Sequence, residues 1–132
     1  DIQPMEWSAL LKIINYPKDP KAFDAVMIGW SLGLDPDGFS LWHSSQYPTG
    51  FNYIKYQNKK IDNLLDKGRT TIDRDARKHI YSKISKILAE EQPYLFLWHP
   101  KSIVGINKRV GGYEKPSVAG AFLYPEKLFV VK

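Results

Sequence analysis

The sequence has no cysteine among its 132 residues, which excludes a disulfide framework and any metal site built on thiolates. Long apolar runs are also missing, since nothing approaches the roughly 18 consecutive apolar residues of a membrane-spanning helix. The chain opens with Asp-Ile-Gln-Pro, with no initiator methionine and no signal-peptide pattern. We therefore expect it to be a piece of a longer protein.

What remains is the composition of a globular domain with one core: 43% apolar, 25% charged and 14% aromatic residues. The net charge of +5 is uneven, because residues 55–86 carry ten Lys or Arg against four Asp. Such a segment could bind nucleic acid. We favour a solvated helical face and expect no nucleic-acid partner, because no aromatic residues are interleaved with the basic ones.

Periodic apolar residues predict helices over 6–15, 58–68 and 73–91. Gly68 is expected to end the second of these helices, and Asp73 to cap the third. A short helix over 39–44 and an irregular loop over 45–57 are also expected. Short apolar runs bounded by turn residues predict strands. Helices and strands alternate, so the predicted class is α/β, a mixed sheet with flanking helices. The predicted strands span residues 23–29, 94–98, 102–106 and 127–131.

One short motif matches a catalytic pattern: residues 29–33 read G-x-S-x-G, the nucleophile elbow of α/β-hydrolases, with Ser31 as nucleophile. That chemistry requires a helix directly after the serine, and Pro36 and Gly38 oppose one. We therefore expect no enzymatic activity, with a serine hydrolase as the alternative from a different functional class.

The supply of bases and metal ligands is equally poor. His43 lies beside Ser44 and Ser45, and adjacent residues of one element are not expected to face each other. Asp35 and Asp37 with His43 give too few ligands for an oxygen-rich metal site. We favour turn chemistry for the two aspartates and expect neither metal nor cofactor.

Several pieces of sequence, taken in order, resemble one family over nearly the whole chain. They are Phe23-Asp24-Ala25 leading to Gly29-Trp30, Asp35-Pro36-Asp37, Trp42-His43-Ser44, Asn52, Asn58, Ile61-Asp62-Asn63-Leu64-Leu65, Asp73 with Arg77 and Tyr81, Ile87-Leu88-Ala89-Glu90-Glu91 before Pro93, Asn107-Lys108-Arg109-Val110 and Gly112-Tyr113. Their order and spacing resemble the C-terminal part of the extracellular solute-binding proteins that include the dipeptide- and oligopeptide-binding proteins of ABC importers.

The resemblance implies a two-lobed, periplasmic-binding-protein-like fold that closes on its ligand. Residues 1–113 would belong to the second lobe, and residues 114–132 would form a tail returning toward the first. The implied function is non-covalent binding of peptides, followed by recognition of the closed form by the permease subunits of an ABC importer. The implied location is periplasmic or extracellular, and membrane-associated in the parent protein.

The resemblance also places the loop from Trp30 to Asp37 at the ligand cleft. In peptide-binding members, an aspartate three residues after the tryptophan holds the ligand's amino group. Here Gly33 takes that position and Asp35 is the nearest carboxylate. We expect the backbone of residues 31–33 to contribute more than their side chains. The predicted ligand-binding residues are Trp30, Ser31, Leu32, Gly33, Asp35 and Trp42.

Two alternatives stay open within this family: an oligosaccharide, bound on aromatic platforms such as Trp30, Trp42 and Tyr53, or a nickel complex. For Trp30 and Trp42, a place in the core is as consistent with the sequence as ligand contact. In a piece of a longer protein, the tail from Lys127 to Lys132 and any face normally covered by the rest of the chain would be exposed apolar surface or an unpaired strand edge. We therefore expect self-association of this chain or strand exchange between copies.

Overall fold

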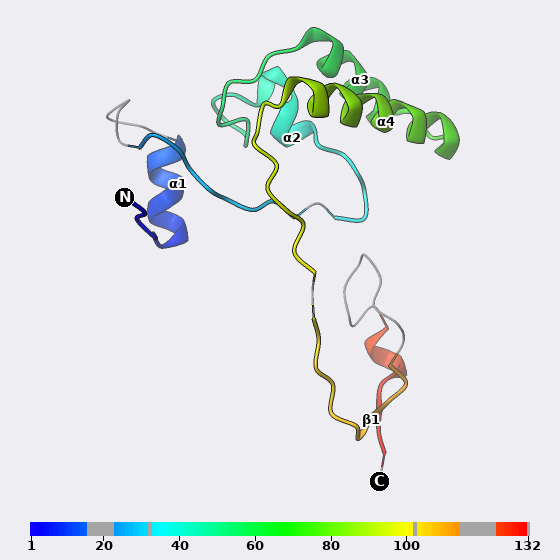
Figure 1. The fold of residues 1–132 in the computed structure, drawn as a ribbon. Helices are drawn as coiled ribbons and strands as arrows, with labels where there is room; N and C mark the ends of the chain where they lie inside the picture. Colours follow the sequence, from blue (N-terminus) through cyan, green and yellow to red (C-terminus); the bar gives the residue numbers. More distant parts are fainter. Residues whose placement is uncertain (16–22, 32, 102, 114–123, 132) are drawn as a thin grey trace. The chain divides into compact units, whose positions relative to one another are not determined.

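The computed structural model describes residues 1–15, 23–31, 33–101, 103–113 and 124–131. These form two compact units, which are described separately: Asp1–Leu32 with Pro36–Tyr94, and Gly33–Asp35 with Leu95–Lys132 (Figure 1). Within the described residues, no helix combines the length and apolar character needed to cross a membrane.

The first unit is helical. Its elements are α1 (Trp7–Asn15), α2 (Phe39–Trp42), the 3-10 turn η1 (Ser44–Gln46), α3 (Lys59–Thr70) and α4 (Arg74–Glu91). The predicted helices are therefore confirmed, with shifted ends. The predicted cap is also confirmed, because the Asp73 carboxylate accepts a hydrogen bond from the Ala76 N–H at 2.8 Å. Asn58 caps α3 in the same way, accepting from the Lys60 N–H at 2.9 Å.

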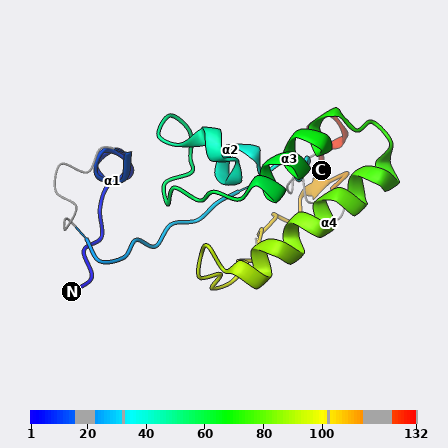
Figure 2. The ribbon, with the colours of Figure 1, turned by 90° about the horizontal axis from the view of Figure 1, so that it is seen from above.

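The core of this unit lies where α3 and α4 pack side by side and α2 packs against α3 (Figure 2). Ile61 and Leu65 of α3 are fully buried. The other members of the core cluster are Leu41, Trp42, Ile80, Tyr81, Ile84 and Leu88. This helical layer is the scaffold to which the loop over residues 43–58 is attached.

The expectation that Gly68 ends its helix is wrong, because α3 continues to Thr70. A Cβ at Gly68 would lie only 3.0 Å from Cζ of Tyr81, so the residue allows α4 to approach closely. Arg77 also donates from Nε to the Gly68 carbonyl at 2.9 Å. The glycine is thus explained by packing between the two helices.

The second unit contains a two-stranded antiparallel sheet. Strand β1 (Val110–Gly111) pairs with β2 (Phe129–Val130), so that Val110 lies opposite Val130. A 3-10 turn, η2 (Pro125–Lys127), precedes β2. The strand predicted over 127–131 is therefore formed over only two residues.

The other predicted strands are not formed in the described part of the chain. Residues 23–29, 94–98 and 103–106 belong to no β-ladder there, and residue 102 lies outside the described residues. A strand is defined by its pairing with a neighbour, and no described segment pairs with these. Of the predicted mixed sheet, the described residues form the two short strands of the second unit.

Candidate functional site

The loop predicted to contact a ligand contains neither helix nor strand in its described residues. Trp30 is half-buried and Ser31 exposed, and both belong to the first unit. Gly33 and Asp35 are exposed and belong to the second unit. Leu32 lies outside the described residues. The first unit therefore positions Trp30 and Ser31, and the contacts below are those within that unit.

Two aromatic rings lie beside the ring of Trp30. Its ring centroid lies 5.5 Å from that of Phe51 and 5.8 Å from that of Tyr53, and the Phe51 and Tyr53 centroids are 6.1 Å apart. The tilted, offset and edge-on arrangements are the favourable ones for aromatic pairs. We call the side chains of Phe51 and Tyr53 the aromatic clamp. It attaches the chain at Trp30 to the loop before α3.

The backbone of residues 29–31 lies next to the clamp. Among the described residues, the N–H and C=O groups of Gly29, Trp30 and Ser31 make no hydrogen bond. An extended segment with free backbone groups is a template for pairing with another extended chain.

Trp42, the other predicted ligand contact, lies in the core with 8% of its surface exposed. Its ring packs against Tyr94, with centroids 4.8 Å apart, and edge-on against Tyr56 at 6.1 Å. A Cβ at Gly38 would meet the Trp42 ring at 2.7 Å, so the turn before α2 also closes over it. This is the core placement that the sequence left open, and ligand contact by Trp42 stays a prediction.

The end of the loop is fixed by Asp37. One carboxylate oxygen accepts from the Phe39 N–H at 3.0 Å, at the start of α2. The other oxygen lies 3.2 Å from Nε of Arg69, whose guanidinium stacks over the Phe39 ring at 4.3 Å. The turn chemistry predicted for Asp37 is thus confirmed, and it ties the loop to α3.

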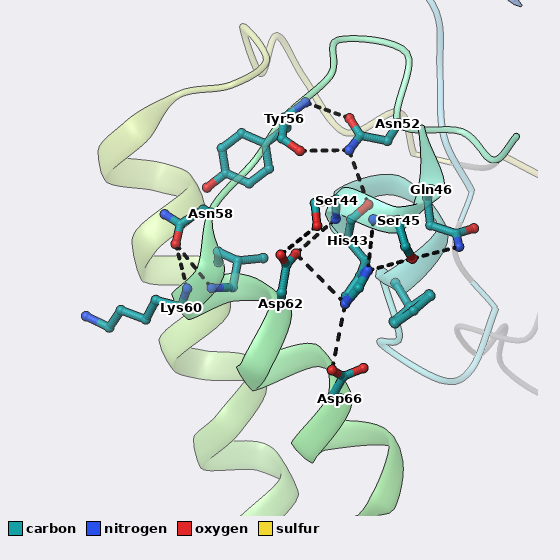
Figure 3. Close-up of polar contacts among 12 residues, drawn as sticks. His43, Ser44, Ser45, Gln46, Asn52, Tyr56, Asn58, Lys60, Asp62 and Asp66 are labelled. Atoms are coloured by element: carbon teal, nitrogen blue, oxygen red, sulfur yellow. Dashed lines mark hydrogen bonds and ion pairs between the residues drawn. The ribbon is translucent and has the colours of Figure 1, made fainter. Parts of the chain in front are cut away.

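Asn52 holds the loop that carries the clamp (Figure 3). This polar residue is buried, with 1% of its surface exposed. Its amide donates to the carbonyl oxygens of His43 at 3.2 Å and Tyr56 at 2.9 Å. Its side-chain oxygen accepts from the Tyr56 N–H at 2.9 Å. Asn52 lies between Phe51 and Tyr53 in sequence, so these bonds also fix where the two rings stand.

A second polar centre surrounds His43 (Figure 3). Its Nδ1 accepts from the Ser45 N–H at 3.1 Å and lies 2.7 Å from the Ser45 hydroxyl. The expectation that these neighbours do not face each other is therefore wrong, because His43 caps η1 instead of lying within a helix. A backbone N–H can only donate, so the neutral ring carries its proton on Nε2, 3.7 Å from Asp66.

Asp62 of α3 completes this centre. Its two oxygens accept from the Ser44 N–H at 2.9 Å and from the Ser44 hydroxyl at 2.7 Å. These bonds tie the end of α2 to α3, so the cluster is explained as support for the loop. Within the described residues, no group of three His, Asp or Glu side chains is arranged to hold a metal ion. A shallow hollow of about 430 Å³ beside it is lined by Ser44, Ser45, Gln57, Asn58, Lys59 and Asp62.

The G-x-S-x-G motif lacks the geometry of a nucleophile elbow. Ser31 is exposed, and the next helix, α2, begins only at Phe39. Among the described residues, no helix N-terminus therefore directly follows the serine to stabilise an oxyanion.

Comparison with known proteins identifies the relatives of this chain. It is 38% identical over 112 residues to the oligopeptide-binding protein AppA of Bacillus subtilis (strain 168), which covers 85% of the chain and 20% of that protein. It is 30% identical over 111 residues to the dipeptide-binding protein of Escherichia coli (strain K12), covering 82% of the chain and 20% of that protein. This chain is homologous to the oligopeptide- and dipeptide-binding proteins. No protein-family model matches it.

A solved structure gives the same result. The structure of AppA from Bacillus subtilis in complex with a nonapeptide matches 100% of this chain and 26% of that one, with 34% identity and a TM-score of 0.78. The resemblance to peptide-binding proteins and the two-lobed periplasmic-binding fold are thereby confirmed. The chain spans about a fifth of the length of the two relatives above.

Within this peptide-binding-protein fold, two functional candidates were not predicted. Phe51 was not singled out at all, although it contacts Trp30 directly. Asn52 was noted only as a point of resemblance, without a role. The local signal was an asparagine between two aromatic residues in a segment without periodicity, and such a segment gives no indication of what its side chains contact.

Proposed function

We propose that this chain is part of a solute-binding protein that captures peptides non-covalently for an ABC importer. The observation that carries the proposal is the match of the whole chain to a peptide-bound oligopeptide-binding protein, with 34% identity and a TM-score of 0.78. Ligand would bind between two lobes, and the permease subunits of the importer would recognise the closed form. The protein would work in the periplasm or outside the cell.

The chemistry of the described loop supports a peptide as ligand. Peptides carry a backbone donor and acceptor at nearly every residue. The N–H and C=O groups of residues 29–31, which make no hydrogen bond among the described residues, are their natural partners. The free amino group of a peptide needs a carboxylate, and Asp35 is the candidate for that charge-assisted hydrogen bond. In this proposal Trp30, Ser31, Leu32, Gly33 and Asp35 line the cleft.

We infer binding without catalysis. The relatives are named as binding proteins, and Ser31 has no helix behind it to build an oxyanion hole. Capture and release then depend on the equilibrium between open and closed forms.

The test is native mass spectrometry of the intact protein that contains this chain, as purified, followed by gentle release of any ligand. A mixed set of co-purified peptides supports the proposal. The matched control is the same protein unfolded in guanidinium and refolded without ligand, which should then bind added peptides in calorimetry. A sugar or a nickel complex in place of peptides would overturn the peptide assignment while keeping the fold. An empty protein that binds no added peptide would overturn the proposal.

A further inference from the structure

Trp30 is held more like a structural side chain than like a ligand platform. Both Phe51 and Tyr53 contact its ring, and the residue also packs against the core cluster between α2, α3 and α4. Its indole Nε1 is buried from solvent. The ring is thus half-buried, and its contacts with neighbouring aromatic side chains fix where it stands.

The two rings that hold Trp30 are themselves fixed to the scaffold. Asn52, between them, makes three hydrogen bonds that join the loop to His43 and Tyr56. His43 in turn precedes Ser44, which is bound to Asp62 of α3. Buried polar networks whose members are all satisfied fix one conformation of the chain around them. A continuous set of contacts therefore runs from α3 to Trp30.

The backbone beside Trp30 has fewer contacts than the Trp30 ring. Gly29 and Ser31 make no backbone hydrogen bond among the described residues, whereas Trp30 between them packs against the core cluster. Backbone groups bind a peptide well only if they are held in place before it arrives, because ordering them on binding costs affinity.

From these contacts we propose that Trp30 is a positioning residue for peptide binding. The aromatic clamp of Phe51 and Tyr53 holds its ring, and the ring holds the backbone of residues 29–31 ready to pair with a peptide. The inference rests on the proposed function and deepens it. According to this inference, the loop before α3 contributes to the affinity for every peptide, independently of the peptide's side chains.

The experiment compares variants of the intact protein by calorimetry with three peptides that differ in one side chain: alanine, phenylalanine or lysine. Phe51→Ala with Tyr53→Ala removes both ring contacts, and its Kd should rise about tenfold for all three peptides alike. Phe51→Tyr with Tyr53→Phe keeps both rings and should restore wild-type affinity. Ile54→Ala, at an exposed residue of the same loop, is the matched control and should leave Kd unchanged.

Hydrogen exchange supplies a second readout. Peptide should protect the amides of residues 29–31 in the wild type and in the ring-keeping variant, and protect them less in the alanine pair. If the alanine pair binds all three peptides like the wild type, or if its loss depends on the peptide side chain, the positioning role is overturned. If the wild type itself binds no peptide, the proposed function fails and this inference fails with it. A lowered melting temperature with unchanged Kd shows a structural role only and also overturns it.

Discussion

The hydroxyl of Tyr56 donates a hydrogen bond to Oε2 of Glu91 at 2.5 Å, which joins the loop before α3 to the last residue of α4. Asn58 donates to the other carboxylate oxygen at 2.7 Å. The same asparagine caps α3, so the start of one helix and the end of the next share one polar contact. These bonds lower the pKa of Glu91, the Tyr56 hydroxyl contributing most. Burial first, and then Glu91, raise the pKa of Tyr56 from 10.0 to about 12.

This contact predicts a loss of stability at high pH. Because the pKa of Tyr56 is raised on folding, its contribution to the free energy of unfolding is complete below pH 10 and is lost as pH rises through about 12. Urea unfolding of the wild-type chain between pH 9 and 12 should show this loss. Tyr56→Phe should be less stable at pH 9 and should lack this part of the alkaline decline. Absorbance at 295 nm should show one fewer late-titrating tyrosine in the variant, and identical titrations would contradict the assignment.

Asn52→Ala should destabilise the first unit strongly. The substitution leaves the carbonyl oxygens of His43 and Tyr56 and the Tyr56 N–H without their partner in a buried place. We expect a loss of about 3 kcal/mol in the free energy of unfolding, measured by urea titration with circular dichroism. Gln57→Ala, in the same loop but exposed, is the control and should stay near the wild type. A loss as small as that of the control would show that water replaces these bonds.

Gly68→Ala should also destabilise, although alanine is the better helix former by about 1 kcal/mol. The new methyl group would lie 3.0 Å from Cζ and 3.1 Å from the hydroxyl of Tyr81. That ring is buried and its hydroxyl accepts from Arg77 at 3.2 Å, so it has little freedom to move aside. We expect a net loss of about 1 kcal/mol in urea unfolding. Asn63→Ala, exposed on the same helix, should instead be neutral or slightly stabilising, and a stabilised Gly68→Ala would show that the ring yields.

The elements that could be predicted are those whose cause is local. The α4 cap at Asp73 is read from a polar side chain just before a periodic run, and the structure confirms it. Gly68 was misjudged because the ring that requires it, Tyr81, is thirteen positions away in sequence. The strands over 23–29 and 94–98 were misjudged for a related reason. Strand pairing is non-local, and an apolar run does not show whether its partner is present.

In the candidate site, too, local features could be predicted from the sequence and non-local contacts could not. The resemblance placed Trp30 and Ser31 in a ligand loop, which stays a prediction. It could not show that Phe51 and Tyr53 hold Trp30, because that contact spans more than twenty residues and follows no spacing rule. The side chains that bind a ligand and those that position them are therefore not separable from sequence.

Asp35→Asn in the intact protein should weaken the binding of peptides with a free amino group. A neutral amide keeps the shape of the side chain but loses the charge-assisted bond to an ammonium group. We expect Kd to rise roughly 10- to 100-fold in calorimetry. N-acetylated peptides should bind wild type and variant alike, and Ser31→Ala should have no effect with either peptide. Equal affinity of Asp35→Asn and wild type for free peptides would remove Asp35 from the amine-anchoring role.

The isolated chain should self-associate through its extended apolar segments, and two isoleucines allow a sharp test. Ile103 is 92% exposed in a segment that belongs to no β-ladder among the described residues, whereas Ile72 is 98% exposed in the turn between α3 and α4. An exposed, apolar, extended segment is a template for pairing with a second chain, and a turn between helices is not. Sedimentation of the wild type should show association that grows with concentration. Ile103→Lys should reduce it, and Ile72→Lys should leave it unchanged. Equal reduction by both would mean that exposed apolar area drives the association, and a monomeric wild type at high concentration would contradict the prediction.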